Sequence, residues 1–520
     1  MTCIKRLVAM FVATASVLFA VSCSEETAVN VKLASKDNMI PDNAVLAVKV
    51  LPEQFWSKLM GNPGSKAQNL WNMAKLYLPL EINKYGEFGK VIKAAMDDPA
   101  TLGVRLNEPI VMTMSLDLNE TAKEKSTGEI CFVALLENSE SFIKAVDALV
   151  EYAEVDGGMD IQKSSSDSYT HYQAFFEIAS IDLGVTSESA VLRYTRYHES
   201  NVPTDLSSSM VKLFANGKQS SKSGVTGFYS STSDLALWLD FEGAVNAFVP
   251  MVKDEKPEAA DMLEGVSSFY EGVSLLAQLD FKKGETGMSL DVCGSEKIKE
   301  VAQKYLTEAS DEQFKYLPNS ALVTANLAIK DLPGLVDEIC GLNEEFSQTL
   351  AEVGINDYLI AGGPGQIAVA FTPRYGKLQY GLAVECTRNV WDFLKRRISK
   401  KNPGLVEWYT EDVGVVNDET IFMYYEGAVR TYDQYAYYLA TYGNTFNLSD
   451  YAEDIKDGGI VLNLRAMDNY PEVFDEMDLD AWVMTFSEGF TGVKLSLKMS
   501  DKSSTLLDKV VNFAADQIRY

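Results

Sequence analysis

The stretch "MIPDNAVLAVKV", residues 39–50, leads from a proline and two turn-forming residues directly into a run of apolar residues. Pro41 restricts the direction of the chain, and Asp42 and Asn43 favour a turn. The following run is rich in small and β-branched residues, which favour a buried strand. A near-copy, "YLPNSALVTANL", occupies residues 316–327. We therefore predict that the stretch begins a domain instead of forming a binding loop, and that this domain occurs twice.

Four further pairs of segments resemble each other in the same order along the chain. They are 108–115 with 365–372, 131–146 with 379–394, 181–194 with 411–424, and 285–292 with 490–497. Because the order is kept while the connections shorten, the pattern predicts a tandem duplication.

Each copy combines strand patterns with amphipathic helix patterns, such as the one over residues 139–153. We predict an α+β fold made of two tandem homologous units, each a mainly antiparallel sheet with helices packed on one face. The expected units are residues 39–306 and 317–520, joined by a polar linker at 307–316.

The N-terminal residues have the pattern of an export signal. A basic pair at residues 5–6 precedes an apolar run at 7–21, and a serine then leads to Cys23. The run is too short for a mature transmembrane helix, which needs about 20 apolar residues. A small residue before a cysteine at this place resembles the lipobox of bacterial lipoproteins, in which the cysteine is diacylated and becomes the first residue. We expect a lipoprotein signal peptide over residues 1–22 and lipidation of Cys23; the alternative is an ordinary secretory signal.

Residues 23–38 are expected to form a tether, which begins with an acidic run directly after Cys23. Such a run resembles the export signal of some Bacteroidota lipoproteins that reach the outside of the cell. We therefore expect a lipid-anchored protein of the outer membrane, with the cell surface favoured over the periplasmic face.

The lipobox, a "(V/I)PxxAxxxxxV" opening strand, an "L-x-x-P-(I/V)" strand and an "F-x-x-G" hairpin together resemble a large uncharacterised family of Bacteroidota lipoproteins, a domain of unknown function. The resemblance covers most of residues 23–520. It implies a place in the cell envelope and brings no activity, cofactor or catalytic residue.

The chain is strongly acidic, with a formal net charge of −28, and no basic stripe offsets this charge. An acidic surface repels the phosphate backbone, so we expect no nucleic acid partner. A hydrophobic content of 47% is enough for well-packed cores.

The residue types of catalytic and metal sites do not form a recognisable motif in this chain. His171 and His198 are the only two histidines, and we interpret both as surface residues. Asp182 and Asp412 occupy equivalent places in the two copies, each two residues before a glycine, and we interpret them as turn residues. We predict no catalytic residues, no metal site and no cofactor.

The cysteines other than Cys23 suggest little chemistry. Cys131 and Cys293 lie in strand-like runs, where a cysteine acts as a small apolar residue. Cys340 and Cys386 form the one disulfide pairing that we consider, and their pairing stays open.

A tyrosine-rich segment at residues 432–451 permits two interpretations. Tyr435, Tyr438 and Tyr442 have the spacing of a helix that packs on its own domain, whereas Tyr437 would lie on the opposite side. Aromatic rings also suit the binding of sugars or proteins. The residues of the possible ligand or partner face are Tyr432, Tyr435, Tyr437, Tyr438 and Tyr442.

We expect a non-catalytic cell-envelope lipoprotein that binds an unknown protein or glycan ligand, in a groove between the units or at the tyrosine-rich segment. Two alternatives are a carboxylate-based glycan hydrolase, which needs two carboxyl groups at a fixed separation, and a scaffold component of an envelope complex.

Overall fold

A computed structural model describes the chain from residue 40 to residue 518 with internal gaps. The residues left out of this range are 42, 61–64, 118–126, 156, 166–168, 198–219, 256–269, 311–316, 318–320, 332–333, 335–364, 375–376, 402, 417–419, 434–436, 438–452, 468 and 488–489. The signal peptide, Cys23 and the tether therefore lie outside the described residues.

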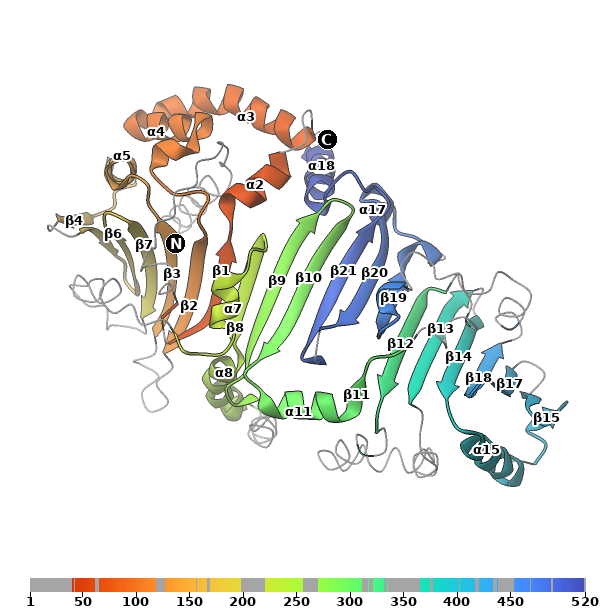
Figure 1. The fold of residues 1–520 in the computed structure, drawn as a ribbon. Coiled ribbons are helices and arrows are strands. Elements are labelled where there is room, and N and C mark those ends of the chain that lie inside the picture. The colour runs from red at the N-terminus through yellow and green to blue at the C-terminus, as the bar shows by residue number, and fades with distance from the viewer. Residues whose placement is uncertain are drawn as a thin grey trace. The chain divides into compact units, whose positions relative to one another are not determined.

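The chain forms a mixed α+β structure that is mostly sheet, with 21 antiparallel strands in its described part (Figure 1). It divides into two compact units. The first comprises residues 1–281, 292–295 and 507–520, and the second comprises residues 282–291 and 296–506.

In the first unit the strands lie in the order β4–β5–β6–β7–β3–β2–β1–β8–β9. They are β1 (Ala44–Val50), β2 (Ile110–Asp117), β3 (Thr127–Leu135), β4 (Ile161–Ser165), β5 (Thr170–Phe175), β6 (Ala179–Val185), β7 (Ser189–Tyr197), β8 (Leu235–Asp240) and β9 (Ser274–Lys282). The helices of this unit are α2 (Pro52–Met60), α3 (Lys66–Ile82), α4 (Gly86–Asp97), α5 (Ser139–Val155), α7 (Val225–Ser230), α8 (Phe241–Glu255) and α18 (Leu506–Ile518).

In the second unit the order is β15–β16–β17–β18–β14–β13–β12–β19–β20–β21–β10. These strands are β10 (Glu285–Cys293), β12 (Val323–Ile329), β13 (Gln366–Arg374), β14 (Lys377–Glu385), β15 (Val406–Trp408), β16 (Val413–Val416), β17 (Thr420–Tyr425), β18 (Ala428–Asp433), β19 (Gly459–Asn463), β20 (Leu479–Phe486) and β21 (Gly492–Met499). The short β11 (Leu306–Thr307) pairs with β12, and the α-helices among the described residues of this unit are α11 (Glu296–Tyr305), α15 (Arg388–Lys401) and α17 (Glu472–Glu476).

The opening stretch behaves as its sequence predicts. The backbone N–H of Ala44 donates to the carbonyl of Pro41 at 3.0 Å, which closes the turn, and β1 follows directly. Strand β1 is central in its sheet, because it pairs with β2 on one edge and with β8 on the other. Ala44 and Ala47 are fully buried. The predicted strand is confirmed, and Asp42 lies outside the described residues.

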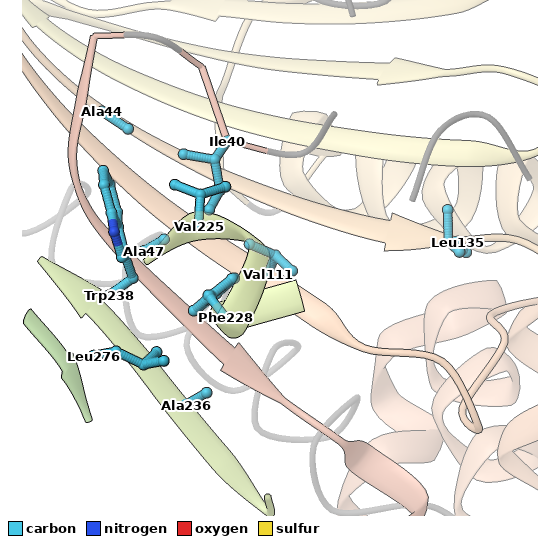
Figure 2. Packing of buried hydrophobic residues seen from close by; sticks show 10 residues of the cluster. All are labelled: Ile40, Ala44, Ala47, Val111, Leu135, Val225, Phe228, Ala236, Trp238 and Leu276. Carbon is cyan, nitrogen blue, oxygen red and sulfur yellow. The ribbon is translucent and has the colours of Figure 1, made fainter. Parts of the chain in front are cut away.

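Helices cover both faces of the sheet in the first unit. On one face, Val225 and Phe228 of α7 pack beside Ala47, Val111 and Trp238 (Figure 2). Successive side chains along a strand point to opposite faces of the sheet. On the other face, α5 packs on a second set of side chains. That set includes Tyr172, Leu183, Val185 and Ala190. The position of α7 is thus an exception to the predicted arrangement with helices on one face.

A buried lysine holds α7 in place. Lys49 of β1 is almost completely buried, and its Nζ donates to the carbonyls of Phe228 at 2.5 Å and Ser231 at 2.6 Å. These carbonyls lie at the C-terminal end of α7, where a cation complements the helix dipole. Strand β1 therefore positions the helix that covers it.

Three of the five pairs of similar segments fall on strands with the same place in the two strand orders. A fourth pair, 285–292 and 490–497, falls on β10 and β21, which pair with each other in the second unit. The fifth pair, 181–194 and 411–424, spans β6–β7 in the first unit and β16–β17 in the second. The strand orders match β16–β17 with β5–β6. Asp182 and Asp412 are therefore not in equivalent places, and that prediction is wrong.

Candidate functional site

A row of polar side chains crosses β5, β6, β7 and β3 on one face of the first unit's sheet. Asp182 lies directly opposite Arg193, and Arg193 lies opposite Cys131. His171 and Ser180 lie on the same face, two positions along. All five side chains are buried, so the register alone brings them together as a buried polar cluster.

Asp182 is the centre of this cluster. His171 Nε2 lies 3.1 Å from Asp182 Oδ1, and Ser180 Oγ donates to Oδ2 at 3.3 Å. The His171 and Asp182 side chains therefore lie within hydrogen-bonding distance, and the tautomer of His171 sets which atom donates. Arg193 Nη2 lies 3.6 Å from Asp182 Oδ2, and the Asp182 side chain has no exposed surface.

A second carboxyl group approaches the same guanidinium. Glu129 Oε2 lies 3.7 Å from Arg193 Nη1, and Cys131 Sγ donates to Glu129 Oε1 at 3.3 Å. Burial raises the pKa of the Cys131 thiol well above its ordinary value, and the charge of Glu129 raises it further. The sulfur is thus held as a neutral thiol, which is a weak nucleophile.

The cluster satisfies its own charges and is closed to solvent. Buried ion pairs of this kind are costly to break, and they need not stabilise the fold more than apolar packing would. A catalytic acid or base must reach its substrate within hydrogen-bonding distance, which fully buried Asp182 does not permit in this conformation. We therefore assign the cluster a structural role.

Two predictions about this region are wrong. His171 is buried within β5 instead of lying on the surface, and Asp182 lies in the middle of β6 instead of in a turn. The missed signal was the i, i+2 spacing of polar residues in three successive strands, as in Arg193 and Thr195. His198 lies outside the described residues.

Asp412 has a more exposed environment in the second unit. It precedes β16, accepts a hydrogen bond from Arg388 Nη1 at 2.9 Å, and accepts another from Trp391 Nε1 at 3.2 Å. Trp391 is fully buried against Trp408, Phe422 and Tyr424. Asp412 thus orients a core tryptophan at the end of a sheet.

The tyrosine-rich segment does not present Tyr432 as part of a ligand face. Tyr432 lies on β18 and is buried, which raises the pKa of its hydroxyl to about 12. The ring of Tyr437 packs against it, with 6.0 Å between the ring centroids. The predicted face is wrong for Tyr432, and Tyr437 contacts the core instead of pointing away from it. Tyr435, Tyr438 and Tyr442 lie outside the described residues.

Cys340 and Cys386 are the two cysteines considered for a disulfide. Cys386 is a buried free thiol, whereas Cys340 lies outside the described residues. No group of three metal-binding side chains occurs in the part of the chain that the structure describes. That part also contains no helix long and apolar enough to cross a membrane.

A small apolar cavity of about 50 Å³ lies between α5 and the strands β4 to β6. Its lining includes Val146, Ala153 and Leu183. Ligand sites in proteins usually measure roughly 300–1,000 Å³, so this cavity is a packing gap.

No family model matches the chain, and no curated protein matches it. Among solved structures, crystal form III of TP0453 shares 13% sequence identity over 50% of this chain and 79% of that chain, with a TM-score of 0.25. Crystal form I shares 8% identity over 76% of this chain and 90% of that chain, with a TM-score of 0.21. Likenesses this weak support no argument about the fold or the function.

We predict that Asp182→Asn lowers the free energy of unfolding by about 3 kcal/mol, because it leaves the buried Arg193 short of a charge partner. The control is Asp412→Asn, which removes a partly exposed carboxylate and should cost less than about 1 kcal/mol. Urea unfolding followed by tryptophan fluorescence measures both values. Equal losses in the two variants would contradict the structural role of the buried polar cluster.

The buried thiol of Cys386 gives a pH dependence. Burial raises its pKa from 9.0 to about 11, so the neutral thiol favours the folded state. This contribution is fully present below pH 9 and is lost as the pH rises through 11. Alkylation of the folded chain at pH 8, mapped by mass spectrometry, should leave Cys386 unmodified, whereas alkylation in urea should modify it. Rapid modification of the folded chain would contradict the burial.

Proposed function

We propose that the protein is a lipid-anchored lipoprotein of the outer membrane that works by binding a protein or glycan, without catalysis. The observation that carries the non-catalytic part is the burial of Asp182. The buried polar cluster is thereby enclosed in the sheet.

The proposed anchor is a diacylated Cys23, supported by the lipobox pattern and the acidic residues behind it. Cys23 precedes Ile40, where the described structure begins, by 17 residues (40 − 23). An extended chain of this length reaches at most about 60 Å, so the first unit would stay close to the membrane. We favour the cell surface over the periplasmic face because of the acidic run.

We also infer that the two units arose by tandem duplication. The support is the order of the strands across each sheet. Strand by strand, the order from β4 across to β9 in the first unit corresponds to the order from β15 across to β20 in the second. Both sheets place the opening strand at the centre and follow the third strand with a long helix, α5 or α15. Membership of the uncharacterised Bacteroidota lipoprotein family remains part of this proposal.

The contact region that we propose is the exposed end of β15 to β17, in place of the buried Tyr432. Tyr409 is 61% exposed and Tyr425 is 46% exposed. The backbone bonds from Tyr409 to Val413 and from Tyr424 to Asp412 bring both tyrosines to the same end of the strands. Tyrosine combines an apolar ring with a polar hydroxyl, which suits the binding of a sugar or a protein surface.

The competing hydrolase would need two carboxyl groups in an open cleft. Glu129 and Asp182 share Arg193, but the buried position of Asp182 speaks against access by a glycan. A scaffold role would be supported by a defined partner that co-purifies from detergent and is lost on Tyr409→Ala.

Cys23→Ala should abolish labelling of the chain by an alkyne analogue of palmitate in cells, because the acyl acceptor is removed. The matched control is Cys3→Ala, which changes a cysteine of the signal peptide and should leave the labelling intact. Gel fluorescence after coupling to a dye measures both variants. Persistent labelling of the Cys23→Ala variant would contradict the proposed anchor.

Surface exposure can be tested separately by adding a protease to intact cells. We expect the chain to be degraded while a periplasmic marker stays intact. Complete protection of the chain until the outer membrane is broken would instead place it on the periplasmic face.

A further inference from the structure

Helix α3 of the first unit carries a group of exposed apolar side chains. Leu76 is 71% exposed and Tyr77 is 68% exposed, and Met73 and Leu78 are also exposed. Met73, Leu76 and Tyr77 follow the i, i+3, i+4 spacing, so they form one stripe along the helix. In a soluble protein such a stripe normally faces the core.

The opposite side of α3 makes the contacts that hold the helix in its unit. Trp71 points to that side and packs edge-on against Trp56 of α2, with 5.3 Å between the ring centroids. Helix α3 also packs on α4, which in turn packs on α5 (Figure 1). The stripe is therefore the outward face of a helix that is already anchored.

This concentration of apolar surface differs from the rest of the described chain. Most other exposed large apolar residues, such as Val155 and Trp482, are separated from one another in sequence and element, whereas Leu405 and Tyr409 flank the short strand β15. Single exposed apolar residues need no explanation, whereas a contiguous patch marks a surface that contacts a partner or a membrane.

The charge around α3 indicates what kind of partner the exposed stripe contacts. The segment from the start of α3 to the end of α4, residues 66–97, contains five lysines, two glutamates and one aspartate, a net charge of +2, in a chain whose net charge is −28. The lysines are Lys66, Lys75, Lys84, Lys90 and Lys93. A second copy of the chain would present the same positive segment and be repelled by it. An anionic lipid surface matches both the charge and the apolar stripe.

We propose that α3 lies in the interface of an anionic membrane, with Met73, Leu76 and Tyr77 inserted at the boundary between head groups and acyl chains. The inference rests on the proposed lipid anchor, which would hold the first unit close to the membrane surface where α3 could insert. With 17 residues, α3 is about 25 Å long and lies along the surface instead of spanning the bilayer.

The test places an environment-sensitive fluorophore on the stripe of the full mature lipoprotein. Tyr77→Cys is labelled with NBD and reconstituted into vesicles of phosphatidylcholine with phosphatidylglycerol. The matched control is Tyr409→Cys, which replaces a tyrosine of similar exposure in the second unit. The unsubstituted chain, treated in the same way, corrects for labelling of the native cysteines.

We expect the emission of the label at residue 77 to shift to shorter wavelength and to be quenched several-fold more by spin-labelled lipid than the label at residue 409. Adding Leu76→Glu should remove most of this difference while the protein still floats with the vesicles. Flotation reports the lipid anchor independently of α3. A chain that floats with an aqueous label at residue 77, or a shift that is equal in vesicles of phosphatidylcholine alone, would overturn the inference; a chain that does not float would overturn the proposed anchor as well.

Discussion

The pairing of β1 on both of its edges is the constraint on which the first unit depends. Because β2 and β8 both bond to it, strands from two distant parts of the sequence meet on one central strand. A central strand needs small or apolar side chains, and Ala44 and Ala47 supply them on the face that α7 covers, without leaving any exposed surface. In the second unit β12 pairs in the same way with β13 and β19. Lys49 extends the influence of β1 to the helix that covers it.

Once the central strand is fixed, the outer strands bring charged groups into the interior, where each must find a partner. His171, Asp182 and Arg193 meet this demand among themselves. The contacts of Asp182 with His171 and with Arg193 thereby link β5, β6 and β7 inside the sheet. The features that we propose for interaction are the outward stripe of α3, the tyrosines at the end of β15 to β17 and the proposed lipid on Cys23.

Elements with a strong local pattern could be predicted from the sequence. The strand at 44–50 and the helix at 139–153 are confirmed, because their burial follows a simple period of two or 3.6 residues. The buried polar cluster could not be predicted from the sequence. The partners of His171 lie on other strands, and the register between the strands decides which side chains meet. Tyr432 was predicted to belong to a possible ligand or partner face, whereas pairing of β18 with β14 places it in the core. Helix α7 is too short to give a periodic signal, and its stability comes from Phe228 and from the Lys49 bonds.

The proposals for the membrane, for α3 and for the exposed tyrosines all assume that the mature chain begins at an acylated Cys23. Intact-mass spectrometry of the protein extracted in detergent tests this assumption most directly. The account predicts the mass of residues 23–520 plus a diacylglyceryl group, with the added mass located on Cys23 after fragmentation. A mature chain with an unmodified Cys23, or one that begins at another residue, would contradict it.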